Sequence, residues 1–569
     1  MYVLKSTTVA VKYIKLPVPK LIGDFEWVDT FGEENIKNVK LGQIVPIYKK
    51  TKGLGCPVEF FAKLSDYGRN PHCLLLESAS VSAKYAQFSM GTAAPCLKIS
   101  GRGDDFEIIA LNSLGERFLL SIKDDLSFSD SLKYGKDRIT GKLKPVRKKG
   151  ISEEERLRQK THVDILRVIA FKFLPTSRPL VPYAGLLGMF SYDFIDQFED
   201  LPKNRQDVLG TPDYEVYFAD NLFICDHKND ATYFIANALV FDEDKDKAVA
   251  ECRSKIDGYI RVQNQTDVPK PRKYLKKKVR IRSDTTKEEF MDTVSRMKEH
   301  ILAGDVFQVV PSRTLMVEYN AEPLDVYRTL RRLNPSPYMF FINSLDSILL
   351  GASPEMSLRV EGEKEKKVEI RPIAGTRPRG IVDGKIDMDL DSKYEIELKL
   401  DKKEVAEHVM LVDLARNDVA RVSKPGTRIV DEPFIVEKYS HVQHLVSNVS
   451  GVLKDDFDAL HAYLASMNMG TLTGAPKVKA MEIIRRLEKN KRCLYGGAVF
   501  YLTPHKDFDS TIIIRSLQIK DDVAYIRSGA GIVYDSVPIY EYEETIKKAR
   551  ACLAAIEKTG GVEYENPVD

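Results

Sequence analysis

The chain has 569 residues, of which 43% are hydrophobic and 30% are charged, a composition typical of soluble globular proteins. Its 86 basic residues nearly balance 83 acidic ones, so the net charge of +3 provides no global field for nucleic acid or anionic lipid. The length allows more than one domain.

Seven widely spread cysteines, an odd number without a CxxC pair, predict a reducing compartment and free buried thiols rather than a zinc site or a disulfide framework. The N-terminus lacks a basic region followed by an apolar core, and no apolar run is long enough to span a bilayer. We therefore expect a cytoplasmic protein that binds neither nucleic acid nor a membrane.

The first part of the chain alternates short β-rich runs with turn-like clusters. The apolar segment 72–80 predicts a strand that ends abruptly at Glu77 and Ser78. Residues 133–160 are strongly basic, and the absence of interleaved aromatic residues apart from Tyr134 favours an exposed insertion over an RNA-binding arm.

A proline- and lysine-rich stretch, 263–284, follows a predicted helix and is the best candidate for a domain boundary. We expect an N-terminal region at 1–270 and a second region at 285–559. The second region should open with a helix that is capped by Thr286 and ends near Gly304.

Strands and a last helix dominate the rest of the second region. The pattern predicts strands at 334–343 and 347–360, three consecutive strands at 495–503, 508–520 and 523–536, and a helix at 539–558. Blocks of strands separated by helices favour an α+β fold with antiparallel sheets over a repeated βαβ unit.

Residues 403–418 form an apolar helical stretch that we expect to be buried on nearly every side. Glu407 lies within it, and a carboxylate there must be paired, protonated or bound to a metal. A buried ion pair with Arg416 or a distant arginine and a metal ligand are both open from this stretch alone.

Two acids on the last helix add to the metal hypothesis. Glu541 and Glu544 lie on one face near its N-terminus, where the helix dipole by itself favours acids. Together with Glu407 they could instead provide an oxygen-only site for a hard cation such as Mg²⁺, which takes few carboxylates and leaves positions for water and an anionic substrate.

An anion site is predicted around Arg515. On the predicted strand it shares the covered face of Ile513 and Leu517, where a guanidinium needs a planar anion. The next strand breaks at 528–531, Ser-Gly-Ala-Gly, whose small residues let the backbone approach a ligand. The chain has no dinucleotide fingerprint, and 470–477 has the wrong spacing for a phosphate loop.

Several further polar residues have an ordinary structural explanation when each is taken alone. Thr471 or Thr473 could cap the helix that follows, with Val478, Met481 and Ile484 facing inward; His444 could be a core histidine and Glu355 a turn residue. Their number in one half of the chain favours a functional site.

The motifs together resemble the large, chorismate-binding subunit of anthranilate synthases. They include GDVFQVVPSR, GASPE, PIAGTRPRG, EHVMLVDLARND, MNMGTLTGAPKVKAM, YGGAV, IIIRS and SGAGIVYDS. The resemblance covers 285–558 almost without gaps, and 74–78 and 186–202 match more loosely. Residues 84–91 depart from the family's pattern, and 133–160 looks like an insertion.

This resemblance implies antiparallel sheets packed as a sandwich and flanked by helices, and a site for chorismate and Mg²⁺. The implied metal ligands are Glu407 and Glu544, and the implied chorismate contacts are Gly375, Thr376, Tyr495, Arg515, Gly529, Ala530 and Gly531. Glu355 matches the family's general acid, and His444 and Thr471 match positions near the reacting ring.

Two residues separate this chain from related families. Aminodeoxychorismate synthases usually have a nucleophilic lysine where Ala374 stands, and isochorismate synthases have a water-activating lysine at the place of Gln308. The resemblance therefore implies direct amination by ammonia. An aminodeoxychorismate synthase component I and a non-catalytic chorismate or tryptophan sensor are the alternatives.

The chain contains no Gly-x-Cys-x-Gly elbow of a glutaminase. The resemblance implies a hetero-oligomer in which a glutamine amidotransferase subunit, anthranilate synthase component II, supplies ammonia. It also implies feedback inhibition by tryptophan at Glu77, Ser78, Pro337, Tyr338 and Met339, which is allosteric if that site is separate from the chorismate site.

Overall fold

The computed structural model describes residues 38–565, except 79–86, 179–180, 205, 243, 268, 273 and 440–441. The N-terminal segment, which lacks the features of a signal sequence, lies outside the described residues. Residues 84–86 of the stretch that departs from the family's pattern also lie outside them. No helix in the described part is long and apolar enough to cross a bilayer.

The first of two large sheets has twelve strands, all antiparallel except for the parallel pair at the β8 edge. Its order is β14 (Arg282–Ser283), β16 (Ser312–Glu318), β30 (Val523–Gly529), β29 (Ser516–Lys520), β18 (Ile348–Ser353), β17 (Tyr338–Asn343), β2 (Cys73–Glu77), β3 (Phe88–Thr92), β11 (Asn221–Asp226), β12 (Ala231–Leu239), β1 (Gln43–Lys52) and β8 (Leu174–Pro175).

The second sheet has thirteen strands and is antiparallel throughout. Its order is β21 (Ile373–Pro378), β25 (Val442–Val452), β20 (Lys367–Ile370), β19 (Met356–Glu361), β28 (Phe508–Ile512), β27 (Ala498–Leu502), β9 (Gly185–Phe190), β10 (Tyr214–Ala219), β4 (Leu97–Arg102), β5 (Asp105–Ala110), β7 (Arg138–Lys142) and β6 (Ser131–Tyr134), and β24 (Ile429–Lys438) pairs with β25. Small pairs join β13 (Lys277–Val279) to β31 (Val562–Tyr564), β15 (Gln308–Val309) to β26 (Gly474–Ala475), and β22 (Ile381–Val382) to β23 (Lys385–Ile386).

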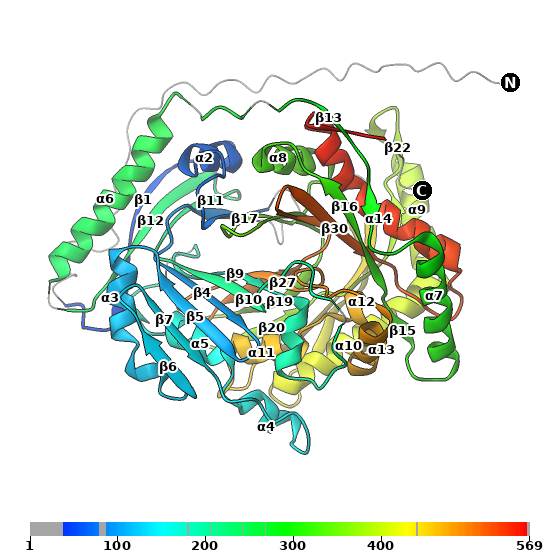
Figure 1. Cartoon of the computed structure of the whole chain (residues 1–569), viewed down its shortest axis with the longest axis horizontal. Helices are drawn as coiled ribbons and strands as arrows, with labels where there is room; N and C mark the ends of the chain where they lie inside the picture. Colours follow the sequence, from blue (N-terminus) through cyan, green and yellow to red (C-terminus); the bar gives the residue numbers. More distant parts are fainter. Residues whose placement is uncertain are drawn as a thin grey trace.

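The two sheets face each other, and helices cover their outer faces (Figure 1). The helices are α2 (Pro57–Leu64), α3 (Ser113–Ser121), α4 (Glu153–Arg158), α5 (His162–Ala170), α6 (Lys245–Asn264), α7 (Lys287–Leu302), α8 (Pro323–Leu333), α9 (Met388–Leu400), α10 (Lys402–Val422), α11 (Ala459–Ser466), α12 (Gly470–Thr473), α13 (Lys477–Leu487) and α14 (Pro538–Lys558), with 3₁₀ turns at Asp124–Leu126 and Tyr192–Gln197. In Figure 1, α2, α8 and α14 lie above the twelve-stranded sheet, whereas α5, α10 and α11 lie below the other. The predicted α+β sandwich is confirmed.

Each half of the chain contributes one half of each sheet. The halves meet where β17 pairs with β2 and where β27 pairs with β9. Strands from both sides of the predicted linker at 263–284 therefore belong to the same two sheets. The division into two regions stays a prediction.

Two chain segments cross from one sheet to the other, side by side. Strands β18 and β19 are joined through Pro354 and Glu355, and β28 and β29 through 513–515. The single strands predicted at 347–360 and 508–520 are therefore wrong, and so is the place of Arg515 within a strand. Arg515 has φ 50°, in the left-handed region, and it redirects the chain between the sheets.

Helix ends with local signals follow the sequence closely. Thr286 caps α7 in a reciprocal capping box with Glu289, and α14 begins one residue before its predicted start. Helix α10 differs from its prediction, because one of its sides lines an open pocket. On that side Val409 is 49% exposed and the Glu407 side chain is 27% exposed. The prediction of a helix buried on nearly every side is wrong.

The segment around Thr471 also differs from the prediction. Thr471 and Thr473 belong to the short helix α12 and cap nothing, because α13 starts after Pro476 without a side-chain cap. Met481 and Ile484 face inward as expected, but Val478 is 43% exposed.

The basic stretch 133–160 is largely exposed, as predicted, but it is not a detached arm. It contributes β7 and part of β6 to the sheet edge, and its side chains pair with acids, for example Arg138 with Glu107 at 3.1 Å. All seven cysteines are free, six of them buried and Cys56 partly exposed, as the sequence predicts.

Candidate active site

The two crossing segments carry Glu355 and Arg515, one on each segment. The carbonyl of Glu355 accepts hydrogen bonds from Ile512 N at 3.1 Å and from the Thr511 hydroxyl at 2.8 Å. The carbonyl of Arg515 accepts one from Ala352 N at 3.1 Å. Backbone bonds therefore hold both residues at the place where the chain leaves one sheet for the other.

Glu355 is only 5% exposed and carries a carboxyl group that is neutral near pH 7. Burial raises its pKa to about 8, and the nearby Thr471 hydroxyl and Lys548 ammonium limit the rise. Neither Glu355 Oε1 nor Thr471 Oγ1, although both are buried, has an aligned hydrogen-bond partner among the described residues. Because buried polar atoms are normally paired, these atoms are available for a ligand.

Arg515 provides a cation that no carboxylate of the described residues holds in an ion pair. Its Nη1 donates to the carbonyl of Lys548 at 3.2 Å, and burial lowers the pKa of its guanidinium. Lys548 in turn donates to the Gly529 carbonyl at 2.9 Å and pairs with Glu544 at 2.6 Å. A partly buried arginine without an anionic partner is suited to a carboxylate ligand.

Gly529 at the end of β30 and Gly531 after it are closely packed by polar groups. A Cβ at Gly529 would lie 3.0 Å from the Tyr495 hydroxyl and 2.5 Å from the Pro311 carbonyl, and one at Gly531 would lie 2.6 Å from Gln308 Nε2. Ala530 between them is fully buried. The structure thus brings the backbone at 529–531, a predicted substrate contact, together with Tyr495 and Gln308. The buried Oε1 of Gln308 lacks a partner in the described chain.

His444 reaches the site from β25. Its Nδ1 lies 3.2 Å from the Gly375 carbonyl and 3.0 Å from the Thr376 hydroxyl. Burial lowers the pKa of His444 to about 4, with a smaller contribution from the charge of Arg515. Since a carbonyl can only accept, Nδ1 carries the proton and Nε2 keeps its lone pair.

Carboxylates from α10 and α14 converge at the edge of the site. Burial raises the pKa of Glu407 to about 7; Lys403 opposes the rise, and the charges of Glu404, Glu544 and Glu541 add to it. Arg416 pairs with Asp413 at 2.9 Å, so the hypothesis of an ion pair between Glu407 and Arg416 is wrong.

A metal at this point would have few protein ligands. No group of three or more histidine, cysteine, aspartate or glutamate side chains in the described chain is close enough to hold one. Glu407 and Glu544 repel each other and supply oxygen only, which fits Mg²⁺ when water and a substrate complete its coordination. Glu407 also lines an open pocket of about 970 Å³.

The five residues expected to bind an inhibitor lie together in a different place. Glu77, Ser78, Pro337, Tyr338 and Met339 line a cavity of about 210 Å³ between the sheets. Met339 stands opposite Glu77 where β17 pairs with β2, and the Ser78 hydroxyl donates to the Pro337 carbonyl at 2.6 Å. Burial raises the pKa of Glu77, whose Oε1 has no partner among the described residues.

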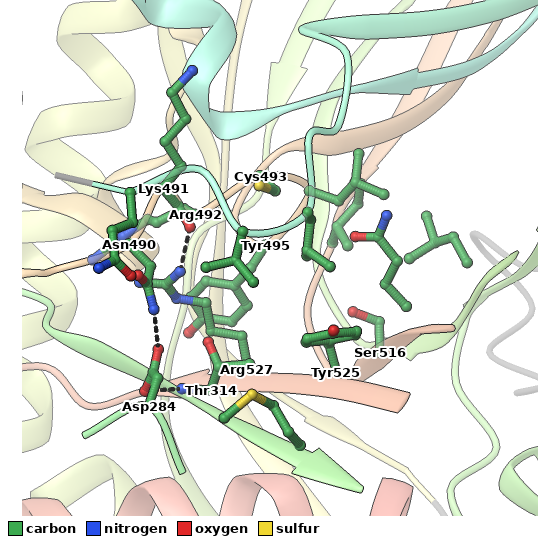
Figure 2. Close-up of a pocket in the computed structure, with 18 of the residues that line it drawn as sticks. Asp284, Thr314, Asn490, Lys491, Arg492, Cys493, Tyr495, Ser516, Tyr525 and Arg527 are labelled. Carbon is green, nitrogen blue, oxygen red and sulfur yellow. Dashed lines mark hydrogen bonds between the residues drawn. The ribbon is translucent and has the colours of Figure 1, made fainter. Parts of the chain in front are cut away.

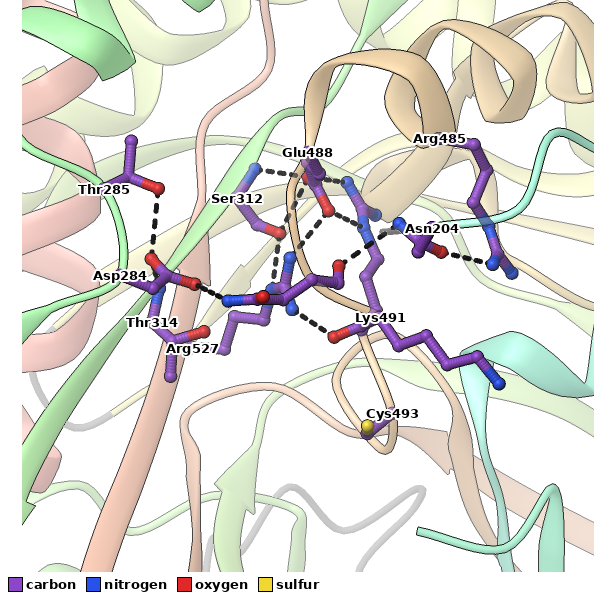
Figure 3. A network of polar contacts seen from close by, with 12 residues as sticks. Asn204, Asp284, Thr285, Ser312, Thr314, Arg485, Glu488, Lys491, Cys493 and Arg527 are labelled. Atoms are coloured by element: carbon purple, nitrogen blue, oxygen red, sulfur yellow. Dashed lines mark hydrogen bonds and ion pairs between the residues drawn. The ribbon is translucent and has the colours of Figure 1, made fainter. Parts of the chain in front are cut away.

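Sequence reasoning missed the residues that support the site from behind. A cavity of about 270 Å³, shown in Figure 2, lies beside Tyr495 and is lined by Arg492 and Arg527. Glu488 and both arginines form a buried ionic cluster, of which Figure 3 labels Glu488 and Arg527. Arg527 in the apolar run 523–531 was an available signal, whereas Glu488 and Arg492 lie in the charged stretch 485–493 and gave none. Thr511, which holds Glu355, had no signal at all.

Comparisons with known proteins find relatives over most of the chain. A family model described as chorismate binding enzyme matches residues 132–554. Anthranilate synthase component 1 of Vibrio cholerae is 42% identical over 486 residues, 85% of this chain and 91% of the relative, and that of Escherichia coli is 40% identical over 503 residues, 88% and 94%.

Two solved structures have the same fold. Anthranilate synthase component I from Streptococcus pneumoniae superposes with a TM-score of 0.66 at 29% identity, over 82% of this chain and 92% of that one. The menaquinone-specific isochorismate synthase from Escherichia coli has a TM-score of 0.58 at 16% identity, over 91% and 95%, which shows the fold alone.

Proposed function

The chain belongs to the family of anthranilate synthase component I, and from that premise we propose that it converts chorismate and ammonia to anthranilate and pyruvate for tryptophan biosynthesis. The observation that carries the proposal is a buried, neutral Glu355 on one crossing segment and, on the neighbouring segment, an arginine without a carboxylate partner in the described chain. An arginine of this kind can bind an organic anion, and a neutral carboxyl group can offer it a proton.

We assign the enolpyruvyl carboxylate of chorismate to Arg515 and Tyr495. The guanidinium has donors left after its bond to the Lys548 carbonyl, and the Tyr495 hydroxyl lies over Gly529. Gly375, Thr376 and the backbone at 529–531 would border the rest of the substrate.

Glu407 and Glu544 would hold Mg²⁺ on the side of the ring carboxylate. When bound, the ion would act as a Lewis acid and stabilise the negative charge that develops on the ring. The mutual repulsion of these acids in the free protein supports this assignment, because a cation would relieve it.

Glu355 would protonate the 4-hydroxyl as it leaves while ammonia adds to the ring carbon next to the ring carboxylate. It is suited to this because its acid form is the stable one below about pH 8. His444 and Thr471 would assist the later elimination of pyruvate. The unprotonated Nε2 of His444 can accept the ring proton whose loss makes the product aromatic.

Ala374 and Gln308 support amination as the outcome. Ala374 is buried in β21 and offers no nucleophile, and Gln308 lies beside Gly531 without a basic group. The relatives named above share the anthranilate synthase description, which favours this reading over an aminodeoxychorismate synthase or a sensor.

Ammonia, tryptophan and the partner belong to the proposal as well. The name component 1 of the relatives implies a component II partner in a hetero-oligomer, and we propose that a glutamine amidotransferase subunit supplies the ammonia. We further propose that tryptophan inhibits from the cavity between the sheets, and that the free cysteines reflect a cytoplasmic location.

The proposal is tested by anthranilate fluorescence from the purified chain with chorismate, Mg²⁺ and ammonium, with and without tryptophan. We expect a signal that requires Mg²⁺ and decreases with tryptophan. Consumption of chorismate without fluorescence would show an aminodeoxy or hydroxy product, and untouched chorismate would favour the sensor.

A further inference from the structure

A buried carboxylate behind the substrate site is held by two arginines. Glu488 follows the end of α13, and its side chain is 4% exposed. It accepts hydrogen bonds from Arg492 Nη2 at 2.6 Å, from Arg527 Nη2 at 2.7 Å and from Ser312 N at 2.8 Å. Burial alone would raise the pKa of Glu488, but the two arginines lower it, so the carboxylate is charged.

Arg492 connects this carboxylate to two backbone segments of the site. Its side chain is 2% exposed, and beyond Glu488 it donates to the Leu472 carbonyl at 2.7 Å and to the Val310 carbonyl at 2.5 Å. Leu472 follows Thr471, and Val310 lies two residues after Gln308. The guanidinium is also 6.0 Å from the centre of the Tyr495 ring.

Arg527 connects the same carboxylate to two further segments. Its Nε donates to the Ser312 hydroxyl at 2.8 Å, and its Nη1 donates to the Lys491 carbonyl at 2.6 Å (Figure 3). Arg527 lies two residues before Gly529, and Lys491 lies four before Tyr495. The cluster therefore joins the segments that present Gln308, Thr471, Tyr495 and Gly529.

We propose that Glu488, Arg492 and Arg527 are positioning residues of the substrate site, with Arg492 fixing the placement of Tyr495 and of the Thr471 segment. This rests on the proposed function, because Tyr495 and Thr471 matter only if chorismate binds between them. Each of the three nitrogens of the Arg492 guanidinium donates to a protein acceptor, so we assign the side chain a role through its neighbours and not through contact with the substrate.

The geometry also explains why arginine is needed at this position. The planar guanidinium reaches Glu488 with two nitrogens and two carbonyls on other sides at once. A lysine would keep the charge for Glu488 but could not hold both carbonyls in a fixed fork. Arg492→Lys therefore separates charge balance from positioning.

The test compares steady-state kinetics of the wild type, Arg492→Lys, Tyr495→Phe and the double variant, with ammonium as the nitrogen source. We expect Arg492→Lys to lower kcat/KM for chorismate by about 30-fold or more, chiefly through KM. In the double variant the effect of Tyr495→Phe should nearly disappear, because the ring is already misplaced.

Arg167→Lys is the matched control. Arg167 holds Asp458 through Nε at 2.7 Å and Nη2 at 3.0 Å, and its side chain is 16% exposed. Its partners include no residue of the substrate site. We expect this variant to lower Tm while leaving the KM for chorismate unchanged.

The outcomes are distinguishable. An active wild type with an Arg492→Lys variant within about twofold of it would overturn the inference alone. Additive effects in the double variant, or an equal rise in KM for Arg167→Lys, would also overturn it and show a general loss of stability. A wild type that leaves chorismate untouched would overturn the inference together with the proposed function.

Discussion

At the scale of single residues, one proton decides whether Glu355 can act. Its pKa of about 8 means that the acid form dominates at pH 7 and is lost as pH rises through 8. A catalyst that must donate a proton should therefore lose activity on the alkaline side, by about tenfold per pH unit well above the pKa.

The first prediction concerns Glu355→Gln. The amide keeps the shape but has no acidic proton, so kcat should decrease by about 10²- to 10⁴-fold, the usual contribution of general acid catalysis. The remaining activity should no longer decline through pH 8. Stopped assays of anthranilate between pH 6 and 9.5 measure both effects, and an alkaline limb that persists in the variant would assign it to another group.

The second prediction concerns the metal. Glu407→Gln removes one of two carboxylates expected to hold Mg²⁺, so titration calorimetry should show at least about a tenfold weaker affinity for Mg²⁺. Asp413→Asn is the control, because Asp413 is an exposed acid of the same helix that pairs with Arg416. Equal heats for both variants would place the ion elsewhere.

At the scale of elements, β21 is shaped by a single glycine. Gly375 has φ +69°, and its carbonyl faces His444 where the pairing of β21 with β25 shifts register. A Cβ there would lie 2.8 Å from Leu398 and 3.0 Å from Glu404. Both the backbone and the space around it require glycine.

The third prediction follows from this element. Gly375→Ala should lower the free energy of unfolding by about 1–3 kcal/mol and should also lower kcat/KM, because a shift of the strand would displace the carbonyl that contacts His444 Nδ1. Gly384→Ala has a similar φ of +76° but meets nothing within 4 Å, so it should cost stability alone. Equal kcat/KM for the two variants would refute a catalytic role for the geometry of β21.

Local signals explain which elements the sequence could predict. The start of α7 is determined by Thr286 and the residues directly after it, so it was predictable. The switch of a strand from one sheet to the other at Arg515 was not, because the apolar pattern of 508–520 is the same in either sheet. The prediction that α10 is buried failed at Val409 for a related reason, since the sequence does not distinguish an apolar side chain at a pocket from one in the core.

At the scale of the whole molecule, the site is assembled from distant parts of the chain. Resemblance to a family predicted Glu77 and Met339 as neighbours, whereas their composition and spacing could not, because β2 and β17 are separated by most of the N-terminal half. Likewise the cluster around Glu488 joins four segments that show no relation in the sequence. The local sequence pattern contains no information on which distant strands pair with each other.

The fourth prediction uses the cavity between the sheets. Tryptophan at a hundredfold excess over its Kd should raise the free energy of unfolding by about 2.7 kcal/mol. Glu77→Gln should weaken this effect, because the unpartnered Oε1 is suited to the ammonium group of an amino acid. Thermal unfolding with chorismate is the control, and its stabilisation should be unchanged in the variant. If tryptophan stabilised the variant as much as the wild type, Glu77 would not be a residue that binds the inhibitor.

The paired crossings have a mechanical consequence. Thr511 lines the cavity between the sheets and also holds the carbonyl of Glu355, so a single residue lies at both places. Both ends of this bond lie at the second sheet, because Thr511 is in β28 and Glu355 directly precedes β19. A displacement of Thr511 at the wall of the cavity would therefore also displace the backbone of the candidate proton donor.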